Sequence, residues 1–152
     1  MEINKQTAKR IYPEQPQWFK DQLVEDFGEE TFREESFEKI KTFELACEAT
    51  KVDPASVFND KDLPDEIAYK KLKVITRAVN QGWVPDWNNT NQCKWWPWFN
   101  LSSGFGFSGS GYDFDYSFAG IGSRLCFESE EKSDFVANQF IDLYKDLLTI
   151  TQ

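Results

Sequence analysis

The chain has 152 residues, of which 40% are hydrophobic, 16% aromatic and 28% charged, and its formal net charge is −9. A chain of this length can bury a core of its own, and its composition excludes a disordered protein. It has no apolar run of the roughly 20 residues needed to cross a bilayer, and no signal peptide opens it. We therefore expect a cytoplasmic protein without a membrane segment.

The chain has no histidine, and its three cysteines, Cys47, Cys93 and Cys126, do not form a closely spaced pair. Scattered cysteines in a chain without a signal peptide indicate reduced thiols. A serine or cysteine nucleophile would have no histidine to activate it. We therefore expect no metal site, no cofactor and no enzymatic activity.

Residues 1–20 are predicted to form an irregular lead-in, because Pro13 and Pro16 would interrupt a helix. An acidic helical part follows over residues 21–82, and its carboxylates are densest in the segment EDFGEETFREESFE. An acidic surface repels phosphate at long range, so direct nucleic-acid binding through the phosphate backbone is disfavoured.

Helical patterns follow in the second half of the acidic part. Ser36 can cap a helix that extends to Cys47, or Thr42 can start a shorter separate helix, and the pattern does not decide between them. A helix over residues 64–81 is predicted more firmly, because Pro64 suits a first turn and Gly82 suits the end. Its apolar residues recur every three or four positions and form one stripe: Ala68, Leu72, Ile75 and Val79.

The aromatic β part, residues 83–128, changes to a period of two. A strand is predicted over residues 94–101, and Pro97 restricts it to a sheet edge or a bulge. Alternating aromatic and small or polar residues predict further strands at 105–107, 112–118 and 123–127. A Gly-Ser-Gly loop at 108–111 is predicted to join the first two of these strands.

Ser129 is predicted to cap a single covering helix over residues 129–148. Its apolar residues step by four, three and four positions, so one face should lie on the sheet: Val136, Phe140, Leu143 and Leu147. The predicted class is α+β in one domain over residues 1–152, with N-terminal helices, a small antiparallel sheet rich in aromatics and a C-terminal amphipathic helix packed on it.

Two motifs suggest chemistry but favour a structural role. The segment from Gly104 to Gly109 matches G-x-G-x-x-G, yet a dinucleotide site needs a helix after it and here a strand pattern follows. Asp113 and Asp115 would lie on the same face of a strand, where they could hold a cation or act as an acid–base pair. The solvent side of an amphipathic strand is the favoured interpretation.

Arg124 is the one base between Lys94 and Lys132. An arginine isolated among aromatics is a candidate anchor for a carboxylate or phosphate. Pairing within the fold, with Asp86, Asp113 or Asp115, is the favoured alternative.

Five of the six tryptophans lie between Trp83 and Trp98. Most of them should pack in the core, and one or two should be exposed at a surface that binds a partner. Stacking on single-stranded nucleic acid or a sugar is the weaker interpretation, because such sites pair aromatics with bases and this half has few. The candidate partner-binding residues are Glu29, Glu30, Glu34, Glu35, Trp87, Trp95 and Trp96.

Four motifs in the second half resemble an uncharacterised family of proteins from phages and prophages of Bacteroides and related bacteria. They are GW-x-P-D-W, K-W-W-P-W-F, G-S-R-L-C-F and F-x-x-L-Y, at Gly82–Trp87, Lys94–Phe99, Gly122–Phe127 and Phe140–Tyr144. The resemblance covers roughly residues 67–148. It implies a phage context and no particular activity.

The expected function is therefore that of a non-enzymatic acidic phage protein in the host cytoplasm, which binds a bacterial or phage protein with a basic surface. Its sharpest form is an inhibitor of a bacterial defence nuclease, in which carboxylates occupy the place of nucleic-acid phosphates. One alternative is a structural or accessory phage protein. A second alternative is an aromatic platform for single-stranded nucleic acid or sugar.

Overall fold

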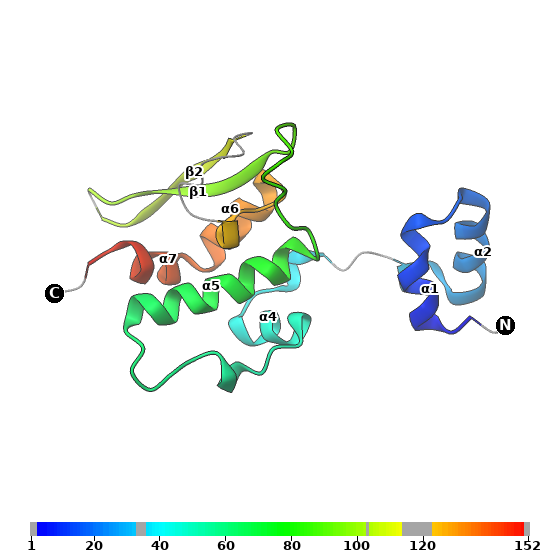
Figure 1. Ribbon diagram of the computed structural model, residues 1–152, viewed down its shortest axis with the longest axis horizontal. Coiled ribbons are helices and arrows are strands. Elements are labelled where there is room, and N and C mark those ends of the chain that lie inside the picture. Colours follow the sequence, from blue (N-terminus) through cyan, green and yellow to red (C-terminus); the bar gives the residue numbers. More distant parts are fainter. Residues whose placement is uncertain (1–2, 33–35, 103, 114–122, 151–152) are drawn as a thin grey trace. The chain divides into compact units, whose positions relative to one another are not determined.

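The structure is a computed structural model that describes residues 3–32, 36–102, 104–113 and 123–150. It divides the chain into two compact units, Met1–Ser36 and Phe37–Gln152, where we expected a single domain (Figure 1). The α+β class is confirmed, since helices and a two-stranded antiparallel sheet make up the second unit.

The first unit is helical, so the irregular lead-in predicted for residues 1–20 is wrong. Its elements are α1 (Lys5–Ile11), the 3-10 helix η1 (Tyr12–Glu14), α2 (Gln17–Phe27) and α3 (Glu29–Phe32). Asn4 caps α1 by accepting a hydrogen bond from the Thr7 N–H at 2.9 Å. Pro13 lies in the first turn of η1 and Pro16 is the N-cap of α2, positions at which the missing N–H of proline costs nothing.

A small apolar centre holds the first unit together. Ala8 and Leu23 are buried, and the rings of Tyr12 and Phe32 stack with their centroids 4.3 Å apart. Gly28 ends α2 with a positive φ of 84°, a backbone conformation that favours glycine, and so separates α2 from α3.

In the second unit, the helical segments begin with the 3-10 helix η2 (Phe37–Lys39), α4 (Phe43–Thr50) and the 3-10 helix η3 (Pro54–Ser56). Of the two alternatives for this region, the structure takes the shorter separate helix. Thr42 caps α4 by accepting a hydrogen bond from the Leu45 N–H at 3.2 Å.

Helix α5 (Pro64–Asn80) confirms the helix predicted over residues 64–81. Pro64 occupies its first turn, and the predicted apolar stripe, represented by Leu72, Ile75 and Val79, is completely buried. Burying three such side chains contributes about 1.5–3 kcal/mol each. The helix ends at Gln81 and Gly82, both with positive φ, and the Trp83 N–H then donates to the carbonyl of Asn80 at 3.0 Å.

The sheet is a hairpin of β1 (Lys94–Asn100) and β2 (Gly106–Asp113), and β1 confirms the strand predicted over residues 94–101. Each strand of a two-stranded sheet is an edge strand, where the missing N–H of Pro97 is tolerated. A bulge follows between Trp98 and Phe99. The Gly-Ser-Gly loop predicted at 108–111 is wrong, because these residues lie inside β2, where Gly109, Ser110 and Gly111 pair with β1.

Two further predictions fail after the hairpin. The strand expected over residues 123–127 is instead the 3-10 helix η4 (Ser123–Leu125), followed by a single bridge between Phe127 and Trp95. The single covering helix expected over residues 129–148 is two helices, α6 (Glu130–Gln139) and α7 (Ile141–Leu148). The break falls at buried Phe140, whose φ of −119° and ψ of 32° are not helical.

The second unit is layered. Figure 1 shows the hairpin over α6 and α7, with α5 beneath them and α4 beyond α5, and contacts between these neighbours agree with that order. Ser129 caps α6, as predicted, by accepting from the Lys132 N–H. The core between the layers contains Leu72, Ile75, Phe127, Val136 and Tyr144.

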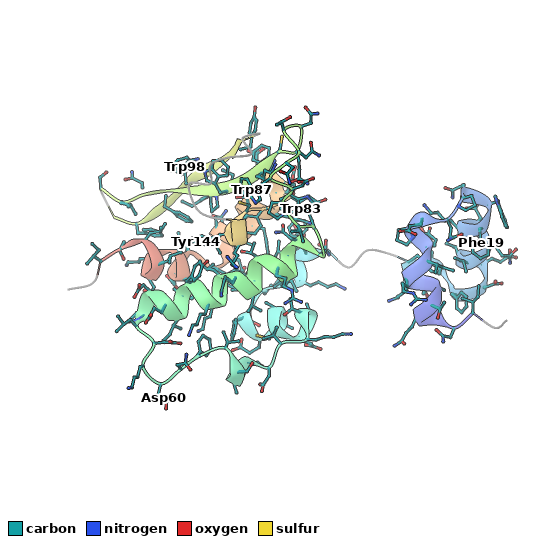
Figure 2. The ribbon with its side chains drawn as sticks, in the orientation of Figure 1. Phe19, Asp60, Trp83, Trp87, Trp98 and Tyr144 are labelled. Atoms are coloured by element: carbon teal, nitrogen blue, oxygen red, sulfur yellow. The ribbon has the colours of Figure 1, made fainter. Side chains whose placement is uncertain are left out.

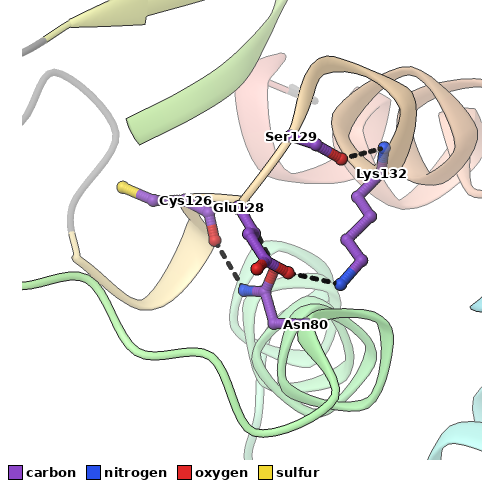
Figure 3. Close-up of polar contacts among 5 residues, drawn as sticks. All are labelled: Asn80, Cys126, Glu128, Ser129 and Lys132. Carbon is purple, nitrogen blue, oxygen red and sulfur yellow. Dashed lines mark hydrogen bonds and ion pairs between the residues drawn. The ribbon is translucent and has the colours of Figure 1, made fainter. Parts of the chain in front are cut away.

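Asn80, at the end of α5, joins that helix to the segment before α6 (Figure 3). Its side-chain amide donates to the Cys126 carbonyl at 2.8 Å and accepts from the Glu128 N–H at 3.2 Å. Glu128 also pairs with Lys132 at 2.7 Å. Asn80 is 4% exposed, so one buried side chain satisfies two backbone groups 46 and 48 residues away.

Candidate functional site

The predicted acidic site belongs to the first unit. Glu29 is exposed at the start of α3, and Glu30 follows it in the same helix. Glu34 and Glu35 lie outside the described residues. The acidic candidates and the tryptophan candidates are therefore on different units of the chain.

Trp87, a predicted partner-binding residue, packs within the fold. It is half-buried, and the Lys94 ammonium lies 5.3 Å from its ring centroid. The side chain of Lys94 is fully buried, and its Nζ donates to the Asn89 carbonyl at 3.1 Å. The Trp87 ring covers the buried Lys94 ammonium, so a partner that displaced the ring would also expose the lysine. We therefore assign Trp87 to the fold rather than to a partner-binding surface.

Trp95 is likewise held by the fold. Its backbone exchanges two hydrogen bonds with Phe127, at 3.0 and 2.8 Å, and its ring lies 4.7 Å from that of Tyr112. The side chain is half-buried against the core. It lies on the inner face of the hairpin, the face from which Ser110 bonds to Ser133 and Asp134 of α6.

Trp96 is on the outer face, and there it has a neighbour that the sequence analysis did not select. Trp98 is 58% exposed, with its ring centroid 6.5 Å from that of Trp96. A Cβ built on Gly111 would lie 2.4 Å from the Trp98 Nε1, so the ring of Trp98 covers this glycine on the neighbouring strand. The signal was present in the sequence: alternate glycines at 109 and 111 leave room for rings from the opposite strand. We call Trp96 and Trp98 the outer tryptophan pair (Figure 2 labels Trp98).

Arg124 is exposed in η4 and forms no ion pair with any carboxylate whose side chain the structure describes. It lines an open pocket of about 360 Å³, whose other charged walls are Lys73 and Arg77 of α5. Of the three aspartates favoured as partners of Arg124, Asp86 accepts from the Asn88 N–H instead, and the side chains of Asp113 and Asp115 lie outside the described part of the chain. The structure thus brings Arg124 together with two cations of α5.

The glycine-rich motif forms no phosphate loop. The segment from Gly104 to Gly109 leads into β2, which continues to Asp113 without the following helix that a dinucleotide site requires. Among the described residues, no group of three or more acidic, cysteine or histidine side chains could hold a metal ion. No helix of the described segments is long and apolar enough to span a membrane.

Cys126 and Tyr144 form a buried pair of acidic groups near Lys94. Burial raises the pKa of the Cys126 thiol to about 11, and the charge of Lys94 opposes that rise in part. Burial, with Cys126 beside it, also raises the pKa of Tyr144. Both groups are therefore neutral in the folded protein at pH 7 and cost free energy when they ionise.

This burial predicts a loss of stability in alkaline solution. As pH rises from 9.0 to about 11, the Cys126 thiol ionises in the unfolded chain and stays protonated in the folded one. The unfolded state then binds fewer protons, so the free energy of unfolding falls, by about 2 kcal/mol over that window. Urea denaturation at several pH values measures the slope of the free energy of unfolding against pH. Cys126→Ala should remove the contribution of this thiol to that slope, whereas Cys93→Ala should keep it. An unchanged slope in Cys126→Ala contradicts the assignment.

Comparison of the chain with protein-family models, with curated proteins and with solved structures found no match.

Proposed function

We propose that this protein is a non-enzymatic binding protein that holds a protein partner on the outer face of its hairpin. The observation that carries this proposal is the outer tryptophan pair, in which Trp98 is 58% exposed although the second unit has a core to bury it. Tryptophan is the residue type most enriched among interface residues that dominate binding energy.

The outer tryptophan pair is also held in place before binding. Trp98 rests on Gly111, and Trp96 lies beside it on the same strand, so both rings are supported by hairpin backbone. A side chain that is already ordered loses less entropy when a partner covers it. Lys94, which shares this face by strand alternation, is fully buried, and its neighbours Trp96, Trp98, Gly109 and Gly111 carry no charge, which disfavours single-stranded nucleic acid as the ligand.

The charge of the chain supports a basic partner. A net charge of −9 steers a positively charged surface at long range, and Glu29 presents one of the carboxylates to solvent. Together with the resemblance to phage proteins, this favours a host protein in the bacterial cytoplasm as the partner. A defence nuclease is the sharpest candidate, because its nucleic-acid channel is basic.

The test is affinity capture from phage-infected bacteria, followed by binding kinetics with the captured protein. Trp98→Ala should speed dissociation by about 30-fold, the loss expected for an interface hot spot. Trp18→Ala is the matched control, because Trp18 is 71% exposed on the other unit and its loss should change nothing. Gly111→Ala should also speed dissociation, since the added methyl group displaces the Trp98 ring.

The charge arm of the same experiment concerns association. Replacing Glu29, Glu30, Glu34 and Glu35 by glutamine should slow association, and raised salt should do the same. Equal kinetics for Trp98→Ala and the unaltered protein overturn the proposal. Micromolar or tighter binding of labelled single-stranded DNA or RNA at low salt would favour the nucleic-acid alternative instead.

A further inference from the structure

The open pocket on α5 is separate from the outer tryptophan pair, and one face of the helix builds its floor. Lys73, Thr76, Arg77 and Asn80 all line it, and their spacing of three, four and seven places them on one side of α5. The adjoining side carries the apolar stripe that faces the core. The pocket volume of about 360 Å³ falls within the range usual for small-ligand sites.

Two other elements close the pocket. The backbone turn at Gln81 and Gly82 brings Trp83 back beside the helix end, where it lines the pocket with Val84 and Pro85 (Figure 2 labels Trp83). Arg124 comes from η4, which packs on α5. The pocket therefore has a cationic side and an apolar, aromatic side.

The pocket is lined by positive charges although the chain as a whole is acidic. Its ten lining residues include Lys73, Arg77 and Arg124 and no acid, in a chain with 26 acidic and 17 basic residues. No described carboxylate forms an ion pair with any of the three; the Lys73 ammonium lies 5.3 Å from the ring centroid of Tyr69. Cations near the end of a helix are favoured by its dipole, which explains Arg77, but Arg124 is not on α5.

Thr76 supplies an independent sign of a missing ligand. It is 2% exposed, and its Oγ1 has no hydrogen-bond partner among the described residues. Threonine in or beside a helix ordinarily donates to the carbonyl four residues earlier, as Thr31, Thr50 and Thr149 do in this chain. A buried hydroxyl without a partner costs free energy, which a ligand oxygen at the pocket would recover.

We propose that this pocket binds a small phosphomonoester with a planar apolar body, such as a nucleoside monophosphate. Arg77 and Arg124 hold the phosphate by charge-assisted hydrogen bonds, with Lys73 as a further positive charge. The Thr76 hydroxyl donates to the same ligand. Trp83 lies against the planar body, with Val84 and Pro85 beside it. Three cations match a dianionic phosphate better than a single carboxylate.

The test is calorimetric titration of the full chain with AMP, adenosine and inorganic phosphate at low salt. AMP should bind with a Kd below about 1 mM, and adenosine and inorganic phosphate should each bind at least about tenfold more weakly. Arg77→Gln and Arg124→Gln should each weaken AMP binding about tenfold or more. Lys61→Gln, an exposed lysine outside the pocket, is the control and should leave the affinity unchanged.

Thr76→Val separates a ligand role from a structural one. The change keeps the shape and removes the unpartnered hydroxyl, so the melting temperature should stay level or rise while AMP affinity falls. The proposal is overturned if AMP does not bind at about 1 mM, or if adenosine or phosphate binds as tightly as AMP. It is also overturned if Arg77→Gln and Arg124→Gln both bind AMP like the unaltered protein.

Discussion

Replacing Tyr144 with alanine is expected to lower the free energy of unfolding by about 3–5 kcal/mol, the range for removing a buried aromatic ring. Tyr144 is completely buried, and its ring lies 4.7 Å from that of Phe99, which joins α7 to the inner face of the hairpin. Losing the ring therefore leaves a cavity between two layers of the second unit. Urea denaturation with an unchanged m-value would measure the loss.

The matched control is Tyr144→Phe, which keeps the ring and removes the hydroxyl. Among the described residues the Tyr144 hydroxyl has no hydrogen-bond partner, so its removal should leave stability unchanged or increase it. Tyr144→Phe should also reduce the alkaline loss of stability above about pH 10, because the phenol of residue 144, which burial keeps protonated in the folded protein, is then absent. A loss of several kcal/mol in Tyr144→Phe would show that the hydroxyl is bonded after all.

Replacing Asn80 with alanine is expected to lower the free energy of unfolding by about 2–5 kcal/mol. The substitution removes the partners of two backbone groups at once, the Cys126 carbonyl and the Glu128 N–H. These groups lie where α5 meets the segment before α6, and water cannot reach them easily while Asn80 is only 4% exposed.

Gln139→Ala is the control for the Asn80 experiment. Gln139 also bonds a distant backbone group, the carbonyl of Lys41 at 2.9 Å, but both residues are exposed. Water replaces that bond, so its loss should change stability by no more than about 0.5 kcal/mol. Similar values for Asn80→Ala and Gln139→Ala would mean that burial of the Asn80 bonds does not contribute.

The parts of the fold that the sequence predicted correctly depend on local patterns. Helix α5 has a proline at its start, an apolar stripe and a glycine after its end, and all three act within a few residues of one another. Strand β1 has a dense run of aromatics and a proline that suits an edge. The cap at Ser129 also needs only its own helix.

The errors arise where distant contacts decide. Gly109 and Gly111 have the composition of a turn, but β1 pairs with them, and the ring of Trp98 needs the space that Gly111 leaves. The break at Phe140 is similar, because the helical spacing of apolar residues continues through it in the sequence. In the structure α6 packs on the hairpin and α7 packs on α5, so the two helices have different packing partners. Of the strand predicted over residues 112–118, the part from residue 114 onward lies outside the described residues.

The candidate sites were only partly predictable for the same reason. Arg124 was recognised because it is isolated in the sequence, but Lys73 and Arg77 had the spacing of an ordinary solvated helix face. Only the tertiary structure brings these cations and Trp83 to one pocket. Trp87 and Trp95 were selected as partner-binding residues from composition alone, which cannot tell a ring that shields Lys94 from a ring such as that of Trp98 in solvent.

The distribution of tryptophan between the two units has a spectroscopic consequence. Trp18 is the one tryptophan of the first unit, and at 71% exposure its emission will hardly change when that unit unfolds. The other five belong to the second unit, where Trp83, Trp87, Trp95 and Trp96 are half-buried. Tryptophan fluorescence therefore follows melting of the second unit alone, whereas far-ultraviolet circular dichroism follows the helices of both. The difference between the two curves isolates the first unit without cutting the chain.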